Sequence, residues 1–126
     1  LPGAYVNITD GKHVYMRAPN ESNSPLFNYT HMPTHMANFF SVDELQDIHI
    51  AEPFSFTKGC RTMKIAAKAW RGMTSPFETL LFDIENDPGQ NNPINNPEVE
   101  KRMINKMIEL MKENDAPQEQ YKRLGL

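Results

Sequence analysis

The feature that most constrains the fold is an amphipathic segment that begins at Asn96. Asn is a favoured N-cap residue, and Pro97 suits the first helical position. Glu98 and Glu100 follow near the positive end of the helix dipole. Apolar residues then recur at helical spacing, at Val99, Met103, Ile104, Met107, Ile108, Leu110 and Met111. The pattern predicts a helix of about 15 residues with one face buried against a sheet or another domain.

Segments rich in β-branched and aromatic residues predict strands before this helix. They span residues 4–9, 12–17, 26–31, 60–66 and 79–84. Asp10 and Gly11 separate the first two strands and accept the positive φ of a type I′ turn, which predicts a hairpin. The Ala-rich continuation of the fourth strand toward Trp70 is also compatible with a helix.

Two shorter helical signals accompany these strands. Ser41 and Glu44 have the spacing of a capping box, which predicts a short helix ending near Ile48. Residues 118–124 are expected to add one or two helical turns. The order of elements predicts an α+β fold, in which a small antiparallel β-sheet of about four strands packs against the long C-terminal α-helix. Residues 1–126 fit a single domain.

Charge and composition exclude several classes of protein. Thirteen basic and sixteen acidic side chains give a net charge of −3, which is too balanced to favour nucleic-acid binding. No apolar run is long enough to span a bilayer, so we expect a soluble protein with no membrane partner. The single Cys60 excludes an internal disulfide and a cysteine-rich zinc site, but leaves a cytoplasmic or periplasmic location open.

Two groups of side chains are candidates for binding. His31 and His35 lie four residues apart, and Pro33 between them favours a bent loop over a metal-binding helix face. The pair can be solvent-facing or can contact substrate in a neighbouring cleft. Five cations lie within a segment that has no acidic residue: Lys58, Arg61, Lys64, Lys68 and Arg71. They can hold an anion or can simply protect an edge strand from aggregation.

Other polar residues give weaker signals. Asp83, Glu85 and Asp87 alternate as in a calcium loop, but Pro88 and Ile94 stand at positions that do not fit one. Cys60 has no motif of a nucleophile, and we interpret it as a buried structural thiol. The sequence therefore contains no self-sufficient active site.

Residues 81–90, LFDIENDPGQ, resemble the closing signature of sulfatases, L-[YF]-D-L-x-x-D-P-x-E-x-x-N-L, which precedes the final helix. Gln90 stands where Glu is usual, and Pro93 and Ile94 replace the usual Asn-Leu. Residues 6–11, 14–17, 32–36 and 55–60 are also similar to the C-terminal part of one bacterial branch of this family, within the alkaline phosphatase superfamily.

The resemblance implies that the chain is the C-terminal subdomain of a longer sulfuric ester hydrolase. The sequence begins at Leu1 without an initiator Met, so we expect polypeptide to precede it. In this family a formylglycine, made from the Cys or Ser of a C-x-P-S-R or S-x-P-S-R motif, attacks the sulfate beside a divalent cation, usually calcium. Both belong to the N-terminal α/β domain, which would be the main partner of this chain. Cys60 is followed by Arg61-Thr62-Met63 and does not match, so we expect no catalytic residue, metal or cofactor here.

The resemblance also implies that loops of this subdomain line the substrate pocket. We expect Thr34, His35, Lys58 and Arg61 to bind the organic part of a sulfate ester, or the sulfate itself. Two alternatives remain open. The chain can be the same subdomain of a phosphodiester or phosphonate hydrolase, or a non-catalytic binding or homo-oligomerisation module. The module would use an apolar set consisting of Met32, Met36, Phe39, Phe40, Phe54 and Phe56.

Overall fold

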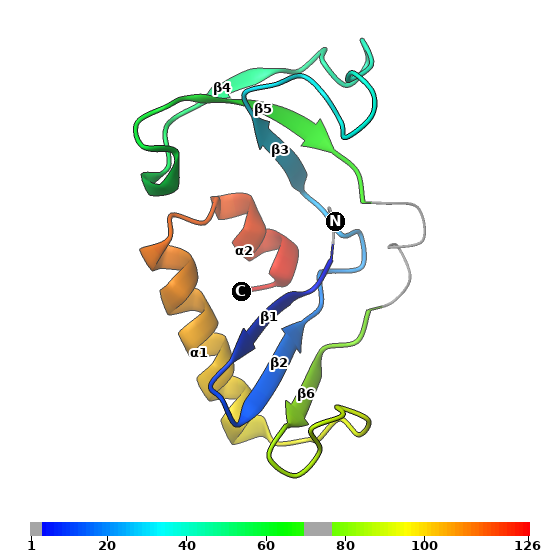
Figure 1. The fold of residues 1–126 in the computed structure, drawn as a ribbon, viewed down its shortest axis with the longest axis vertical. Helices are drawn as coiled ribbons and strands as arrows, with labels where there is room; N and C mark the ends of the chain where they lie inside the picture. The colour runs from blue at the N-terminus through cyan, green and yellow to red at the C-terminus, as the bar shows by residue number, and fades with distance from the viewer. Residues whose placement is uncertain (1–3, 70–76) are drawn as a thin grey trace.

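The structure is a computed structural model that describes residues 4–69 and 77–126. These residues form an α+β fold, as predicted, with two antiparallel sheets and two α-helices (Figure 1). The strands are β1 (Val6–Thr9), β2 (His13–Arg17), β3 (Leu26–Thr30), β4 (His49–Ala51), β5 (Thr62–Ala67) and β6 (Leu80–Asp83). The helices are α1 (Pro97–Glu113), α2 (Gln118–Leu124) and a short 3-10 helix, η1 (Ser55–Thr57). Leu1, Trp70 and Arg71 lie outside the described residues. The helical alternative for the continuation toward Trp70 does not form in its described part, because β5 extends to Ala67 and residues 68–69 are not helical.

The strands divide between two sheets instead of joining one sheet of about four strands. One sheet has the order β1-β2-β6, and the other has the order β3-β5-β4. The connection after β2 leaves this sheet and contacts α2, where the amide of Asn20 donates to the carbonyl of Arg123 at 2.7 Å. Strand β3 pairs with β5, in a register that places Tyr29 opposite Lys64, and not with β2. The chain leaves and re-enters the β1-β2-β6 sheet at one place, where the amide of Ala18 donates to Thr79 Oγ1 at 3.2 Å.

The hairpin forms, but its turn is displaced by one residue from the predicted position. The β1–β2 register pairs Thr9 with Val14, which leaves Gly11 and Lys12 as the central residues of the turn. Gly11 has a φ of 87°, whereas Asp10 is not in the positive-φ region, so the expected type I′ turn is wrong. The Asp10 carboxylate instead accepts hydrogen bonds from the amides of Lys12 and His13, at 3.0 and 2.6 Å. This side-chain cap holds Asp10 in the ordinary backbone region.

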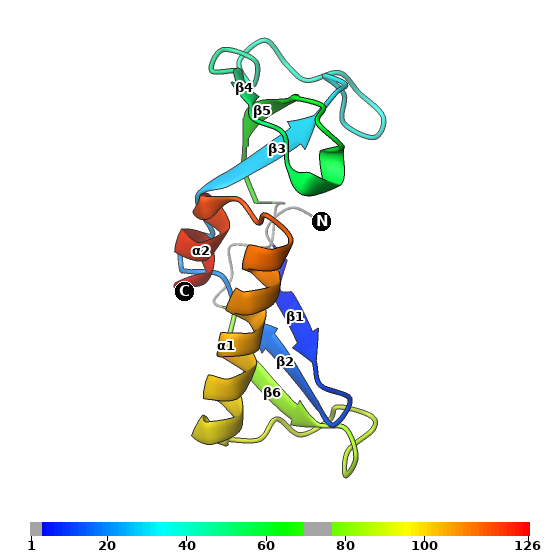
Figure 2. The ribbon, with the colours of Figure 1, turned by 90° about the vertical axis from the view of Figure 1, so that its left-hand side faces the viewer.

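The larger core lies between α1 and the β1-β2-β6 sheet (Figures 1 and 2). The strand registers align Ile8, Tyr15 and Leu81 across one face of the sheet. Met103 and Met107 of α1 pack on this face and are almost completely buried. Leu110, which the apolar spacing places on the same stripe, is 38% exposed, whereas the neighbouring Met111 is partly buried against the core.

The predicted N-cap of α1 is confirmed, since Asn96 Oδ1 accepts a hydrogen bond from the amide of Val99 at 3.2 Å. Asn96→Ala removes this acceptor and is expected to lower the free energy of unfolding by about 1 kcal/mol. Urea denaturation followed by circular dichroism measures the change. Asn95→Ala, one residue outside the helix, is the matched control and should change stability by less than half as much. Equal effects of the two substitutions would contradict the capping role.

The predicted helix near Ser41 does not form, although its capping box does. The amide of Ser41 donates to Glu44 at 2.8 Å, and the amide of Glu44 donates to Ser41 Oγ at 3.3 Å. Residues 42–47 continue as turns. Val42 is exposed, and Leu45 and Ile48 are only half-buried, so little apolar burial is available to stabilise a full helix.

Helix α2 lies between the two sheets (Figures 1 and 2). Its Leu124 is buried, and its Arg123 donates to Asn23 Oδ1 at 3.0 Å and to the carbonyl of Ala4. Ile65 of β5 and Phe40 are also buried. Across the described ranges, none of the helices has the length and apolar character needed to cross a membrane.

Candidate functional site

Two of the four predicted substrate-binding residues line one cavity, which we call the His35 cavity. It has a volume of about 1150 Å³ and is enclosed by β3, residues 34–47 and the end of β5. Thr34 and His35 both line it. The His35 ring packs on Phe40, with ring centroids 4.0 Å apart, and its Nε2 lies 2.8 Å from Glu44 Oε1. These contacts hold the imidazole at the edge of the cavity.

The lining of the His35 cavity is acidic on balance. It includes Asp43, Glu44 and Asp47, against one cation, Lys68. The amide of Ser41 and the ring of His35 donate to Glu44 and hold the pKa of this carboxyl below its usual value. Ionised carboxylates accept hydrogen bonds from hydroxyl and amine groups and repel anions. The lining of the cavity therefore favours a group that donates hydrogen bonds over an anion.

Lys58 and Arg61 lie near the opposite end of β5 from the His35 cavity. Lys58 caps η1 with a φ of 51°, and Arg61 forms an ion pair with Glu52 at 3.0 Å. Neither residue is among those that line the cavity. The carbonyl of Arg61 lies 3.1 Å from His31 Nε2, which is the link between this end and the histidine loop. The structure thus brings Thr34 and His35 together and leaves Lys58 and Arg61 apart from them.

The described cations of the basic segment diverge and do not form one anion site. Lys64 points toward α2 and lies 3.3 Å from Glu119, while Lys68 lines the His35 cavity. His31 and His35 likewise have separate partners, Arg61 and Glu44. Within residues 4–69 and 77–126, no three His, Cys, Asp or Glu side chains are arranged to hold a metal ion.

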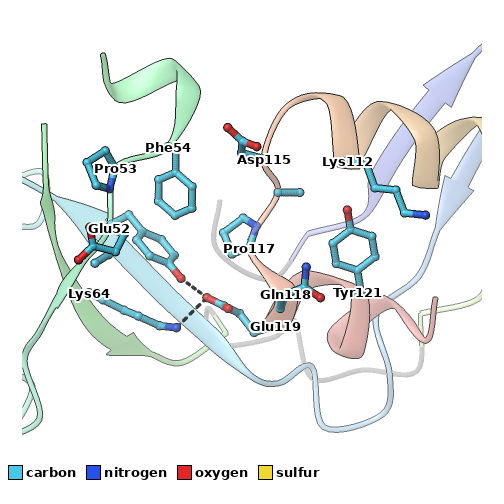
Figure 3. Close-up of a pocket in the computed structure, with 13 residues that line it drawn as sticks. Glu52, Pro53, Phe54, Lys64, Lys112, Asp115, Pro117, Gln118, Glu119 and Tyr121 are labelled. Atoms are coloured by element: carbon cyan, nitrogen blue, oxygen red, sulfur yellow. Dashed lines mark hydrogen bonds and ion pairs between the residues drawn. The ribbon is translucent and has the colours of Figure 1, made fainter. Parts of the chain in front are cut away.

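A second cavity, which we call the helix-corner cleft, lies where α1 meets α2 (Figure 3). It has a volume of about 620 Å³, and its walls are β3, β5, residues 51–54 and residues 112–121. Glu119 accepts a hydrogen bond from the hydroxyl of Tyr29 and pairs with Lys64. Figure 3 shows both contacts as dashed lines. The Glu119 side chain is only 12% exposed and that of Lys64 is 27% exposed.

The contacts of Glu119 favour the ionised form of its carboxyl group. Burial raises the pKa of Glu119, but the hydrogen bond from Tyr29 and the pairing with Lys64 outweigh burial, so the pKa lies below its usual value. Burial and the neighbouring carboxylate raise the pKa of Tyr29. Sequence reasoning missed this cluster because its three members lie on β3, β5 and α2, and no local pattern marks Glu119.

The acidic residues of the sulfatase-like segment stabilise a turn by accepting hydrogen bonds from its backbone amides. Asp83 accepts hydrogen bonds from the amides of Glu85 and Asn86, and Asp87 accepts one from the amide of Asn92 at 2.7 Å. The side chain of Asn86 lowers the pKa of Asp83, and the amide of Asn92 lowers that of Asp87. Because these carboxylates are already engaged, they do not fit a calcium site, and Cys60 lacks the motif for formylglycine. Cys60 is also exposed, so the expectation of a buried thiol is wrong. The residues present therefore fit neither a calcium ion nor a formylglycine.

Comparison with known proteins gives no match, whether with protein-family models, with curated proteins or with solved structures.

Proposed function

We propose that this chain is the C-terminal subdomain of a sulfuric ester hydrolase of the sulfatase type. It completes the fold of the enzyme and forms part of its substrate pocket. Catalysis belongs to an N-terminal α/β domain, which carries the formylglycine and the calcium ion. The isolated 126-residue chain is inactive as an ester hydrolase in this proposal.

The observation that carries the proposal is the sulfatase-like segment together with the helix that it leads into. Residues 81–90 continue from β6 into a turn, and the Asp carboxylates of this turn bind backbone amides. The chain then enters α1 through the Asn96 cap. The resemblance implies this order of strand, Asp-Pro turn and terminal helix. In the sulfatase signature, the two Asp positions therefore have a structural explanation that does not require catalysis.

Exposed apolar side chains support docking against a larger domain. Met32, Met36, Phe39 and Phe56 are all more than half exposed, and they belong to the loops of the β3-β5-β4 sheet. Phe40, expected in the same set, is buried. Light scattering of the purified chain distinguishes this docking from the homo-oligomerisation alternative. A monomer that binds the separately expressed N-terminal domain supports the proposal, whereas a stable homo-oligomer that does not bind it favours the module.

Within the parent enzyme, the His35 cavity holds the organic part of the ester in this proposal. Thr34 and His35 supply polar contacts, and the acidic lining favours a group that donates hydrogen bonds. Lys58 and Arg61 stay in the proposal as residues that approach the substrate from the other end of β5. A phosphate ester would fit the same cavity, so activity assays on both ester types are needed.

The test uses the gene and the longer protein that it encodes. The proposal expects a C-x-P-S-R or S-x-P-S-R motif a few hundred residues upstream of Leu1, and hydrolysis of 4-nitrophenyl sulfate by the full-length chain. In that enzyme, His35→Ala and Lys58→Ala should each reduce kcat/KM by about tenfold, which is the loss of one polar contact of about 1.4 kcal/mol. Thermal denaturation should show little change, since both side chains are exposed. Unchanged kinetics for both variants would refute the substrate-binding role.

A further inference from the structure

We propose that the helix-corner cleft is a second ligand site, which binds a small molecule consisting of an apolar body and one anionic oxygen group. The group can be a carboxylate or a sulfate ester, because both present several acceptor oxygens and a negative charge. The site is separate from the His35 cavity, and the inference does not depend on the proposed sulfatase function.

The hydrogen-bonding side chains that line the cleft divide into carboxylates that have partners and side chains that have none. Each carboxylate already has a partner: Glu119 binds Lys64 and Tyr29, Glu52 binds Arg61, and Asp115 accepts from the amide of Ser55 at 2.9 Å. Among the described residues, the side chains of Lys112, Gln118 and Tyr121 have no hydrogen bond or ion pair. These three groups carry N–H and O–H donors. Gln118 and Tyr121 can also accept, but Lys112 can only donate, so a ligand that meets Lys112 must bring an acceptor.

Charge decides where an anion could lie, because the lining is close to neutral as a whole. Lys64 and Glu119 neutralise each other, and so do Arg61 and Glu52, whereas Asp115 keeps its negative charge and accepts from the neutral amide of Ser55. Lys112, in the last turn of α1, is the lining cation that keeps an unpaired charge among the described residues. A hydrogen bond between an ammonium and an anionic oxygen is roughly twice as strong as a neutral one. Lys112 is accordingly the group that we expect to hold the anion, with Tyr121 and Gln118 as neutral donors.

An apolar surface lies within the same cleft. Phe54 packs edge-on against Tyr29, with centroids 5.0 Å apart, and stacks on Phe56 at 5.1 Å. These two contacts fix the ring of Phe54 before a ligand arrives. Pro53 and Pro117 add rigid apolar surface on either side of it (Figure 3). A pre-formed apolar surface beside a few polar groups is the usual composition of a small-molecule site.

The cleft is also held in shape by contacts between its walls. The Tyr29–Glu119 hydrogen bond and the Lys64–Glu119 pair join β3 and β5 to α2, and Asp115 joins η1 to the end of α1. The donors and the Phe54 ring therefore belong to elements that are tied together. A ligand does not need to assemble the site, so less ordering entropy opposes binding.

Titration of the ¹⁵N-labelled 126-residue chain with phenyl sulfate, benzoate, inorganic sulfate and phenol tests the proposal by NMR. Phenyl sulfate or benzoate should shift the amides of residues 51–54 and 112–121, and the stronger of the two identifies the preferred anion. Inorganic sulfate lacks the apolar body and phenol lacks the charge, so each should bind at least about fivefold more weakly.

Lys112→Ala should weaken binding of the preferred anion about fivefold, as expected for one partly exposed charged contact. Lys101→Ala, which removes another exposed cation of α1 outside the cleft, should leave the affinity unchanged. The proposal is overturned if the anions shift only residues 34–47, if they shift neither region, or if Lys112→Ala and Lys101→Ala have equal effects. None of these readouts involves ester cleavage, so failure here leaves the proposed function standing, and failure of that function leaves this site standing.

Discussion

Replacing Met103 with alanine is expected to lower the free energy of unfolding by about 3 kcal/mol, the largest effect that we expect from a single substitution. Met103 is 1% exposed and packs against Tyr15 and Leu81, where α1 covers the β1-β2-β6 sheet. The substitution removes buried apolar surface and leaves a cavity that the rigid sheet cannot close. Urea denaturation at equilibrium measures the loss.

Met36→Ala is the matched control for this experiment. The two substitutions remove the same atoms, but Met36 is fully exposed, at 107% of its reference area. Its replacement should change stability by no more than about 0.5 kcal/mol. A loss below about 1 kcal/mol for Met103→Ala would show that α1 does not pack on the sheet as described.

Glu119→Ala is expected to cost about 2 kcal/mol. It leaves the ammonium of Lys64 without its carboxylate and removes the acceptor of the Tyr29 hydroxyl. Removing one partner of a fully buried pair costs about 3–5 kcal/mol, and the partial exposure of Lys64 reduces this cost. Glu113→Ala, on the exposed end of α1, is the control and should have little effect. A double-mutant cycle with Lys64→Met measures the coupling, which should exceed about 1 kcal/mol.

The lowered pKa of Glu119 predicts that the free energy of unfolding depends on pH. The pKa of Glu119 is lower in the folded protein than its ordinary value of 4.5. A carboxyl whose pKa is lowered by folding stabilises the protein above the unfolded pKa, and this contribution disappears as the pH falls through the folded pKa. The difference in stability between the wild type and Glu119→Gln should therefore be constant near neutral pH and shrink below about pH 4.5. A difference that grows on acidification would contradict this assignment.

Elements with strong local signals were predictable from the sequence, and those that depend on pairing partners were not. Helix α1 has an N-cap, a proline at its first position and an apolar stripe, and all three are readable in one segment. Strand β4 has three residues and no alternating pattern; it exists because His49 and Ala51 pair with Lys64 and Thr62 of β5. The division into two sheets was equally hidden, because no local pattern shows that β3 pairs with β5 instead of β2.

The candidate sites show that sequence reasoning can group residues that lie close together in the chain but not residues that lie far apart. Thr34 and His35 lie close in sequence and line one cavity, so local reasoning could group them. Lys58 and Arg61 were grouped with them by chemistry alone, and the length of β5 separates the pairs. The helix-corner cleft joins Tyr29, Phe54 and Lys112, which are far apart in the chain. No spacing rule could identify it, since its geometry exists only after both sheets have packed around α2.

The hydrogen bond between Ala18 and Thr79 also bears on how this fold can change during evolution. Since the chain departs and returns at neighbouring points, the whole β3-β5-β4 sheet is topologically an insertion in a host unit made of β1, β2, β6 and α1. Insertions with adjacent ends tolerate changes of length and sequence with little disturbance to the host. Descendants of this protein could thus diversify the loops around His35 and acquire new ligand preferences, while the host unit retained its ancestral packing.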